Sequence, residues 1–250
     1  GFDFPDVSMD YRFVVADDPG HYPVLGEGFT IDAGSHGPAE TFGCDEFPAE
    51  VVESQVEHST ALHAHLRSGD GYLVGPLARF AMASERLHPT AAEVARGIGL
   101  VAPVDNPFRS VMVRAVEVVH AGAVALEIID SLSPADLAGP PSLEAPPPAA
   151  GTAVGHGITE APRGLLYHRY ANDPDRTITD AVIVPPTTQN QPTIEHDLWL
   201  VAEDMLAEFG DDLSYADLQH RCEVAIRNHD PCISCATHFL DMSVERRSSQ

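Results

Sequence analysis

The stretch PFRSVMVRAVEVVHAGAVALEIIDSL, residues 107–132, is a long periodic segment on which the expected fold depends. Its apolar or small side chains recur at three- and four-residue intervals, the spacing that places them on one face of an α-helix. That face holds Val111, Ala115, Val118, Gly122, Leu126 and Ile129. We therefore predict a core helix here and, for the chain, a mainly α fold with small β-rich segments, of the α+β class.

The residues before this helix divide into two parts. Residues 1–86 alternate short apolar runs with Gly and Pro, as in YRFVVADDPG, YPVLGEGFTI and GYLVGPLARF, which predicts short strands and turns with one helix at residues 50–66. Pro89 then precedes TAAEVARGIGL, and proline is favoured in a first helical turn. We expect a small α+β segment at residues 1–86 and core helices at residues 87–132.

The residues after the helix begin with a connection rich in Pro, Ala and Gly at residues 133–151, which cannot sustain helix or strand. Residues 152–250 are expected to form one further part. Apolar runs at residues 164–170 and 177–184, separated by ANDPDR, predict a β-hairpin. Helices are predicted at residues 193–209 and 214–227, with Thr193 and Ser214 as N-caps. The second ends before Asp230 and Pro231, so the cysteines beyond it follow a helix end.

Charge and composition narrow the classes of function. Asp and Glu number 38 against 14 Lys and Arg, a formal net charge of −24 that repels nucleic-acid phosphates and anionic membranes. No run approaches the roughly 20 apolar residues that span a bilayer, so we expect a soluble protein. Four cysteines are too few for a disulfide framework, which predicts reduced thiols and a cytoplasmic location. The chain starts at Gly1 with no signal peptide, as a piece of a longer protein would.

The spacing of Cys232 and Cys235 alone leaves several kinds of site open. A structural zinc site needs four ligands, usually from two such pairs, and the sequence has no second pair. A thioredoxin-like redox pair would lie at a helix N-terminus after a strand, whereas this pair follows a predicted helix. Zinc binding, redox activity and two inert cysteines therefore remain alternatives.

The longer string around the pair, DPCISCATH at residues 230–238, resembles the C-terminal metal-binding motif of nickel-iron hydrogenase large subunits. Four upstream strings resemble the same family in order: VGPLARF at residues 74–80, NPFRSVMVRAVE at 106–117, GITEAPRG at 157–164 and PPTTQN at 185–190. They are similar to group 3 members, cytoplasmic enzymes that couple hydrogen to soluble carriers such as NAD(P). The resemblance implies the helical core of such a large subunit.

The resemblance also implies a nickel-iron centre, in which four thiolates hold nickel and two of them bridge an iron that carries carbon monoxide and cyanide. Soft thiolates suit such ions better than carboxylates do. By this resemblance Cys232 is the terminal nickel ligand, Cys235 is the bridging ligand, and His238 binds a magnesium or similar ion. Without the motif, His238 would be read as an ordinary surface histidine.

Three further residues gain catalytic roles from the resemblance. Arg163 is similar to the arginine that overhangs the metals, Asp230 to the carboxylate that partners it, and Thr187 to a hydroxyl that donates to cyanide. Taken alone, they would be a surface ion-pair member, a helix-ending turn residue and a turn residue, respectively. Glu160 and His168 lie in matched strings and are expected only to support the site from outside it.

The sequence departs from the family at one point that matters for chemistry. The family takes its other two cysteines from an N-terminal RxCGxC motif, and neither Cys44 nor Cys222 has a second cysteine at that spacing. The chain is thus expected to be the C-terminal portion of a large subunit and incomplete on its own.

The function implied is reversible cleavage of H2, with electrons passing through an iron-sulfur small subunit and carrier-reducing diaphorase subunits to NAD(P). The alternative is a degenerate, non-catalytic scaffold subunit that lacks a complete metal centre. A hydrolase built on the 13 histidines is disfavoured, because no nucleophile–histidine–carboxylate spacing accompanies them.

Overall fold

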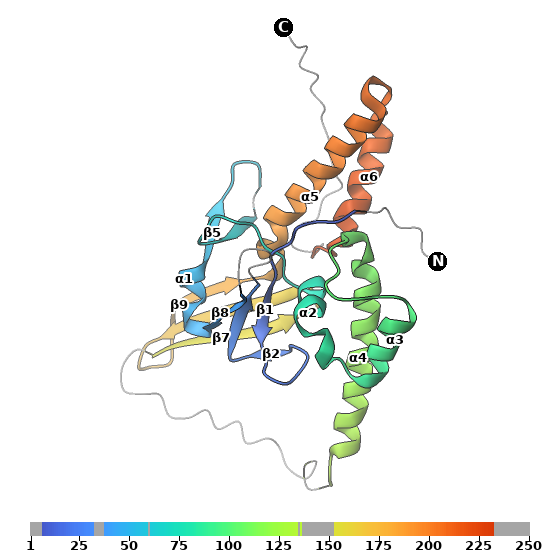
Figure 1. Cartoon of the computed structure of the whole chain (residues 1–250). Helices are drawn as coiled ribbons and strands as arrows, with labels where there is room; N and C mark the ends of the chain where they lie inside the picture. Colours follow the sequence, from blue (N-terminus) through green and yellow to red (C-terminus); the bar gives the residue numbers. More distant parts are fainter. Residues whose placement is uncertain (1–6, 33–37, 60, 135, 137–152, 233–250) are drawn as a thin grey trace.

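The computed structural model describes residues 7–32, 38–59, 61–134, 136 and 153–232 (Figure 1). Its strands are β1 Val14–Asp17, β2 Leu25–Gly26, β3 Gly28–Ile31, β4 Glu40–Gly43, β5 Val51–Gln55, β6 Leu62–Leu66, β7 Ala153–Ala161, β8 Gly164–Asn172 and β9 Ile178–Val184. Its helices are α1 Phe47–Glu50, α2 Pro76–Ala83, α3 Pro89–Gly97, α4 Ser110–Ser131, α5 Pro186–Phe209 and α6 Tyr215–Asn228. Long helices beside small sheets confirm the predicted α+β class.

The described strands form three antiparallel sheets, in the orders β1-β3-β4, β2-β7-β8-β9 and β5-β6. The predicted hairpin is confirmed as β8 and β9. Strand β7 was not predicted, because Gly155 and Gly157 interrupt its apolar pattern and glycine is disfavoured in strands. Since Ala161 pairs with Gly164, the tight turn between β7 and β8 consists of Pro162 and Arg163.

Two predictions for the first 86 residues were wrong. The range 50–66 was expected to be helical, but it contains β5 and β6, which form a hairpin in which Val51 pairs with Leu66 and both side chains are buried. The β-branched valines favour a strand, and burial against the sheet core decides between two patterns that a short run cannot separate. GYLVGPLARF, expected to be strand and turn, contains α2, with Pro76 in its first turn. The helix predicted after Leu87 is confirmed as α3.

The long helix is confirmed as α4, but the face predicted to be its core is wrong. Val113 and Val116 are fully buried, whereas Val118 and Leu126 are 72% and 63% exposed. The predicted stripe and the true one both consist of apolar residues three or four positions apart, because α4 carries apolar side chains around most of its circumference. Periodicity therefore located the helix without identifying the side that packs against α2 and α3.

Helices α5 and α6 stand side by side as an antiparallel pair (Figure 1). Helix α5 begins at Pro186 and not at Thr193, so PPTTQN is its first turn and not a separate turn. Thr193 is inside the helix, where its Oγ1 donates to the carbonyl oxygen of Tyr72 at 2.7 Å. Ser214 is confirmed as the N-cap of α6, since its Oγ accepts from the backbone N–H of Asp217 at 3.1 Å.

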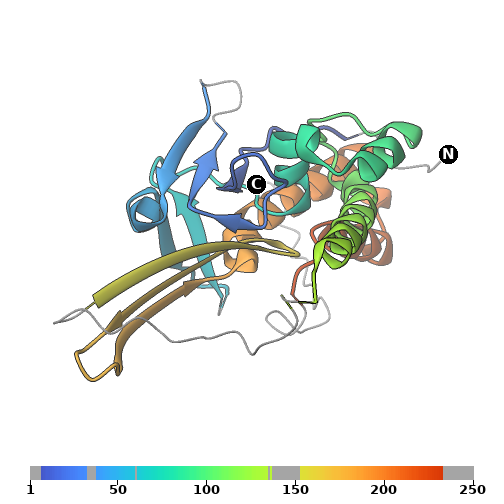
Figure 2. The same ribbon diagram turned by 90° about the horizontal axis from the view of Figure 1, so that it is seen from below.

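Two hydrophobic clusters meet where the chain passes from the sheets to the helices. One packs around β1, β3 and β8, and the other around α2, α3 and α4. Figure 2 shows β7, β8 and β9 extending away from α4. Leu73 belongs to the helical cluster and its neighbour Val74 to the sheet cluster. Most of the predicted connection at residues 133–151 lies outside the described residues, and the described part contains no helix that could cross a membrane.

Candidate functional site

Arg163 and Asp230, which we expected to be partners, lie together although 67 residues separate them. Arg163 is in the β7–β8 turn, and Asp230 follows the end of α6 with a left-handed backbone, φ 47°. Arg163 Nε donates to the carbonyl oxygen of Asp230 at 2.5 Å, and Arg163 Nη2 lies 3.5 Å from Asp230 Oδ1. The fold thus brings the turn of the matched string GITEAPRG to Asp230, the first residue of the string DPCISCATH.

A pocket beside this pair collects polar groups from four parts of the chain. Its polar lining consists of Ser110, Arg114, Arg163, Asn190, Asn228 and His229. These residues come from α4, the β7–β8 turn, the start of α5 and the end of α6. Arginine side chains remain charged and carry several donors in a fixed plane, so Arg114 and Arg163 make this pocket suited to groups that bear negative charge.

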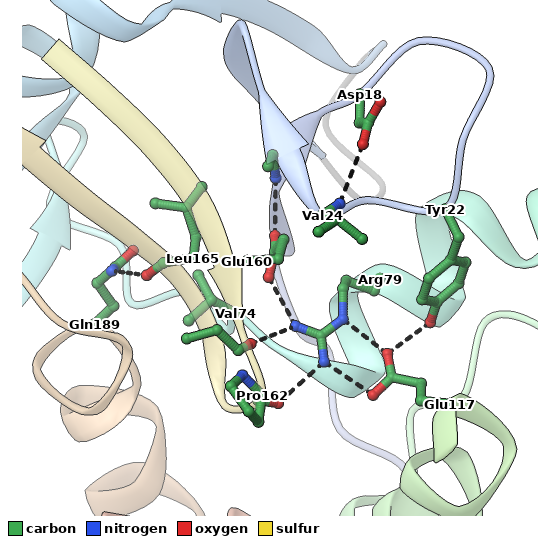
Figure 3. Close-up of polar contacts among 12 residues, drawn as sticks. Asp18, Tyr22, Val24, Val74, Arg79, Glu117, Glu160, Pro162, Leu165 and Gln189 are labelled. Carbon is green, nitrogen blue, oxygen red and sulfur yellow. Dashed lines mark hydrogen bonds and ion pairs between the residues drawn. The ribbon is translucent and has the colours of Figure 1, made fainter. Parts of the chain in front are cut away.

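Arg79 of α2, which the sequence did not single out, holds the turn that carries Arg163 (Figure 3). Its Nε and Nη2 donate to the two carboxylate oxygens of Glu117 on α4 at 2.7 and 2.9 Å, and Nη1 donates to Glu160 Oε2 on β7 at 2.7 Å. The same guanidinium donates to the carbonyl oxygens of Ala161 and Pro162, each at 3.0 Å. Of the five hydrogen bonds that Arg79 donates, two hold the backbone immediately before Arg163, one holds Glu160 on β7, and two join α2 to Glu117 on α4.

The carboxylates around Arg79 are almost removed from water. Glu160 is 2% exposed; its Oε1 accepts from the backbone N–H of Ala16 at 2.9 Å. Burial raises the pKa of Glu160, and the charge of Arg79 opposes that shift. Glu117 also accepts from the hydroxyl of Tyr22 at 2.7 Å. Each of these ionised groups has a partner, which is the condition under which buried charge is tolerated.

The backbone around Arg163 is packed too closely for side chains at two positions. Gly75 has φ 105°, and a Cβ there would lie 2.5 Å from the carbonyl oxygen of Arg163. Gly164 has φ 136°, and its Cβ would lie 2.8 Å from the nitrogen of Gly75. Glycine tolerates positive φ and leaves room for such an approach. The VGP and PRG strings therefore lie backbone against backbone.

Two amide side chains at the start of α5 stabilise the close packing of Gly75 against the Arg163 turn. Asn190 Oδ1 accepts from the backbone N–H of Val74 at 2.8 Å, and its Nδ2 donates to the Val74 carbonyl oxygen at 3.3 Å. The buried Gln189 donates to the carbonyl oxygens of Leu165 and Val184, at 2.6 and 3.3 Å. Asn190 thus holds Val74, which lies next to the Gly75 that packs against the Arg163 turn, and Gln189 holds Leu165, which follows that turn in β8.

The C-terminal end of α6 is held by α4. Ser110 Oγ and Arg114 Nη1 both donate to the carbonyl oxygen of Asn228, the latter at 3.1 Å. Asn106 begins this part of the chain, where its Oδ1 accepts from the N–H of Phe108 at 2.9 Å. The string NPFRSVMVRAVE is thereby linked to the residues directly before Asp230.

A second buried chain of polar groups ends at His229. Its Nε2 lies 2.9 Å from Asp197 Oδ2 on α5, and the same oxygen accepts from the hydroxyl of Tyr11 at 2.5 Å. His229 and Asp197 are 4% and 3% exposed. Burial, together with the neighbouring charge of Asp197, raises the pKa of Tyr11, so that hydroxyl stays protonated as a donor. The residue before Asp230 is therefore fixed to both α5 and the N-terminal segment.

The remaining predicted site residues are placed in part. Thr187 is buried in the first turn of α5, and Cys232 is half-buried beyond α6. Cys235 and His238 lie outside the described residues. His168 is on β8, where its Nδ1 lies 2.8 Å from the hydroxyl of Tyr170.

The other two cysteines have ordinary structural surroundings. Cys222 is buried in α6, and burial raises the pKa of its thiol. Cys44 is half-buried, and its Sγ donates to the carbonyl oxygen of Glu27 at 3.2 Å. Burial also raises the pKa of the Cys44 thiol. Neither Cys44 nor Cys222 lines the pocket beside Arg163 and Asp230.

The sequence alone missed several residues that build the site, above all Arg79, Gln189, Asn190 and Asp197. The first three lie inside strings that had been matched to a family, namely VGPLARF and PPTTQN, so membership of those strings was an available signal. Asp197 lies outside them, and no pattern in the sequence marks it.

Comparison with known proteins matches residues 63–238 to the family model described as nickel-dependent hydrogenase. The beta subunit of the NAD-reducing hydrogenase HoxS of Cupriavidus necator is 41% identical over 51% of this chain and 25% of its own length. Sulfhydrogenase 1 subunit alpha of Pyrococcus furiosus is 30% identical over 78% of this chain and 44% of its own length. The chain thus spans less than half the length of these relatives.

Solved structures give the same result for the fold. An NAD+-reducing [NiFe]-hydrogenase in the H2-reduced state superposes with a TM-score of 0.75 and 26% identity, over 93% of this chain and 51% of the other. A [NiFeSe]-hydrogenase of Dm. baculatum superposes with a TM-score of 0.58 over 92% of this chain and 52% of the other; at 19% identity it supports the fold alone.

Proposed function

This chain belongs to the nickel-dependent hydrogenase family, and from that premise we propose that it is part of the catalytic large subunit of a nickel-iron hydrogenase that cleaves H2 reversibly. The observation that carries the proposal is the contact between Arg163 and Asp230 beside the cysteine motif. The buried network around Arg79 supports the proposal further, because two of its donors hold the backbone carbonyls immediately before Arg163.

The described residues fit a thiolate-bound metal centre. Cys232 follows Asp230 by two residues, so its Cα lies within about 7.6 Å of the Asp230 Cα. Its sulfur is a soft donor of the kind that nickel and iron sites with thiolates require. We assign Cys232 and Cys235 as nickel ligands and His238 as a ligand of a magnesium ion. The bound nickel-iron centre, with carbon monoxide and cyanide on iron, would supply the position that accepts hydride from H2.

The protein groups around that centre would act by charge and position. Arg163 carries a permanent positive charge, and Asp230 holds its guanidinium from one side, so its remaining N–H groups can stabilise negative charge as H2 divides. Thr187 would donate a hydrogen bond from its hydroxyl group to a cyanide nitrogen. The donors of Arg79 fix the carbonyls before Arg163, which keeps the guanidinium in one place without reorganisation during the reaction.

The electron path and carrier follow from the relatives by analogy. We propose that electrons leave through an iron-sulfur small subunit and carrier-reducing subunits to NAD(P). The Cupriavidus necator relative belongs to an NAD-reducing hydrogenase and the superposed structure is that of an NAD+-reducing [NiFe]-hydrogenase, which supports this carrier. We further propose a cytoplasmic location, in keeping with such a soluble carrier.

The test is H2-dependent reduction of NAD(P) by the complete protein with its partner subunits. Arg163→Lys should retain nickel but lose roughly 100-fold or more in rate, because a lysine cannot replace the several fixed donors of a guanidinium. The matched control is Arg169→Lys, which changes an arginine paired with Asp180 on the partly exposed hairpin and should leave the rate unchanged. A nickel-loaded protein that cleaves no H2, or an Arg163→Lys variant with full activity, would contradict the proposal.

A further inference from the structure

A cluster of two histidines and a glutamate lies outside the site described above. His58 is in the connection between β5 and β6, His63 is on β6, and Glu195 is on α5. His58 Nε2 lies 3.1 and 3.2 Å from the two carboxylate oxygens of Glu195, and His63 Nε2 lies 3.3 Å from Oε1. The cluster therefore joins the hairpin to the helix that carries Gln189 and Asn190.

His63 has the features of a ligand more than those of a structural residue. Its side chain is 3% exposed, and its Nε2 lies 3.3 Å from Oε1 of Glu195 but makes no hydrogen bond with any part of the chain that the structure describes. Buried polar atoms are nearly always hydrogen-bonded, so each exception calls for an explanation.

The spacing of the three groups suits a small metal ion. One ligand atom from each of His58, His63 and Glu195 can be chosen so that all lie within 4.8 Å of one another. Bonds of about 2.0–2.2 Å from zinc to nitrogen or oxygen place neighbouring tetrahedral ligands roughly 3.3 Å apart. The distances of 3.1 and 3.3 Å from the carboxylate to the two rings already match that spacing.

We propose that His58, His63 and Glu195 bind a divalent transition-metal ion of the zinc class. Two imidazoles and one carboxylate leave one tetrahedral position open for water. The ion clamps the β5–β6 hairpin to α5 and satisfies the unpaired Nε2 of His63. None of its ligands is a cysteine, so the site is independent of the nickel-iron assignment and stands if that assignment fails.

The test measures zinc bound by the purified complete protein after chelation and reloading with Zn2+. Wild type should hold one more zinc ion per chain than either His58→Ala or Glu195→Gln. The affinity of the cluster for zinc should fall about 10- to 100-fold or more in each variant. His220→Ala, which removes an exposed histidine from α6, is the matched control and should bind as wild type does. All proteins keep the same cysteines, so the difference reports the cluster alone.

Thermal unfolding separates loss of the ion from damage to the fold. His58 is 65% exposed, so without zinc His58→Ala should melt at the wild-type temperature. Added zinc should raise the melting temperature of wild type and His220→Ala more than that of His58→Ala, because only a ligand bound to the native state stabilises it. Equal zinc content and equal shifts in all three proteins would overturn the proposal.

Discussion

Replacing Arg79 with methionine tests whether one buried guanidinium holds the turn that bears Arg163. Methionine preserves much of the side-chain volume but removes all five hydrogen bonds to Glu117, Glu160 and the two turn carbonyls. Glu160 would then be a buried carboxylate without its cationic partner, at 2% exposure. Arg79 is itself 4% exposed, so water cannot replace its donors without opening the structure.

The expected loss of stability follows from these contacts. Removing one partner of a buried ion pair costs about 3–5 kcal/mol, since it leaves an uncompensated charge. Two carbonyl groups that lose their donors add to this cost, which makes the range a lower estimate. Against a total stability of about 5–15 kcal/mol, Arg79→Met should remain folded but melt roughly 10 °C lower.

Urea unfolding followed by circular dichroism measures this loss, and its pH dependence identifies the cause. Burial already raises the pKa of Glu160 while Arg79 opposes the shift, so removing Arg79 raises that pKa further. A carboxylic acid whose pKa is higher in the folded state than in the unfolded state favours folding while it is protonated. The free energy of unfolding therefore falls as pH rises through the folded-state pKa and the buried acid ionises. The free-energy gap between wild type and Arg79→Met should therefore narrow as pH falls towards the Glu160 pKa.

Two controls bound the interpretation. Arg227→Met removes a 68%-exposed arginine whose contact with Glu223 is 3.4 Å, and it should change stability by less than about 0.5 kcal/mol. Arg79→Lys keeps the charge but cannot span both carboxylates, so it should fall between Arg79→Met and wild type. A change below 1 kcal/mol in Arg79→Met, or a gap that is constant with pH, would refute the reasoning.

Two further comparisons test the packing. Gly75→Ala should destabilise the protein by about 1–3 kcal/mol more than Gly69→Ala in urea unfolding. Both glycines have positive φ, but only a Cβ on Gly75 meets the carbonyl oxygen of Arg163. Equal losses of stability in the two variants would mean that backbone strain alone determines the cost. Val113→Ala should lower the free energy of unfolding by roughly 1–3 kcal/mol and Val118→Ala by less than about 0.5 kcal/mol, since Val113 is fully buried and Val118 is 72% exposed. The reverse order would show that the face of α4 predicted from periodicity is the buried one.

The sequence predicted those elements whose local chemistry leaves one choice. Ser214 as an N-cap, Pro89 in a first turn and the polar turn between β8 and β9 each specify an element without help from distant residues. The β5–β6 hairpin and β7 depend on their partners: Val51 is in a strand because Leu66 pairs with it across the sheet. Such pairings are non-local, and a single sequence does not show them.

The candidate site was predicted unevenly for the same reason. Arg163 and Asp230 were paired through matched strings, and the structure brings them together. The contacts that hold them lie between strings: Asn190 binds the backbone of Val74, and Arg79 binds the carbonyls of Ala161 and Pro162. Asn190 and Val74 are 116 positions apart in the sequence, and Arg79 and Ala161 are 82 positions apart. Nothing in the spacing within either string predicts which distant residue it will contact.

Nickel content is the most direct test of the central claim that the chain beyond α6 supplies thiolates to a nickel-iron centre. The complete protein should be purified from nickel-fed cells as wild type, Cys232→Ser and Cys222→Ser, and its nickel measured per chain. Cys222 is a buried structural thiol of α6, which makes it the matched control. The account predicts that Cys232→Ser loses nickel and that Cys222→Ser keeps it. Equal nickel in wild type and Cys232→Ser would contradict the assignment.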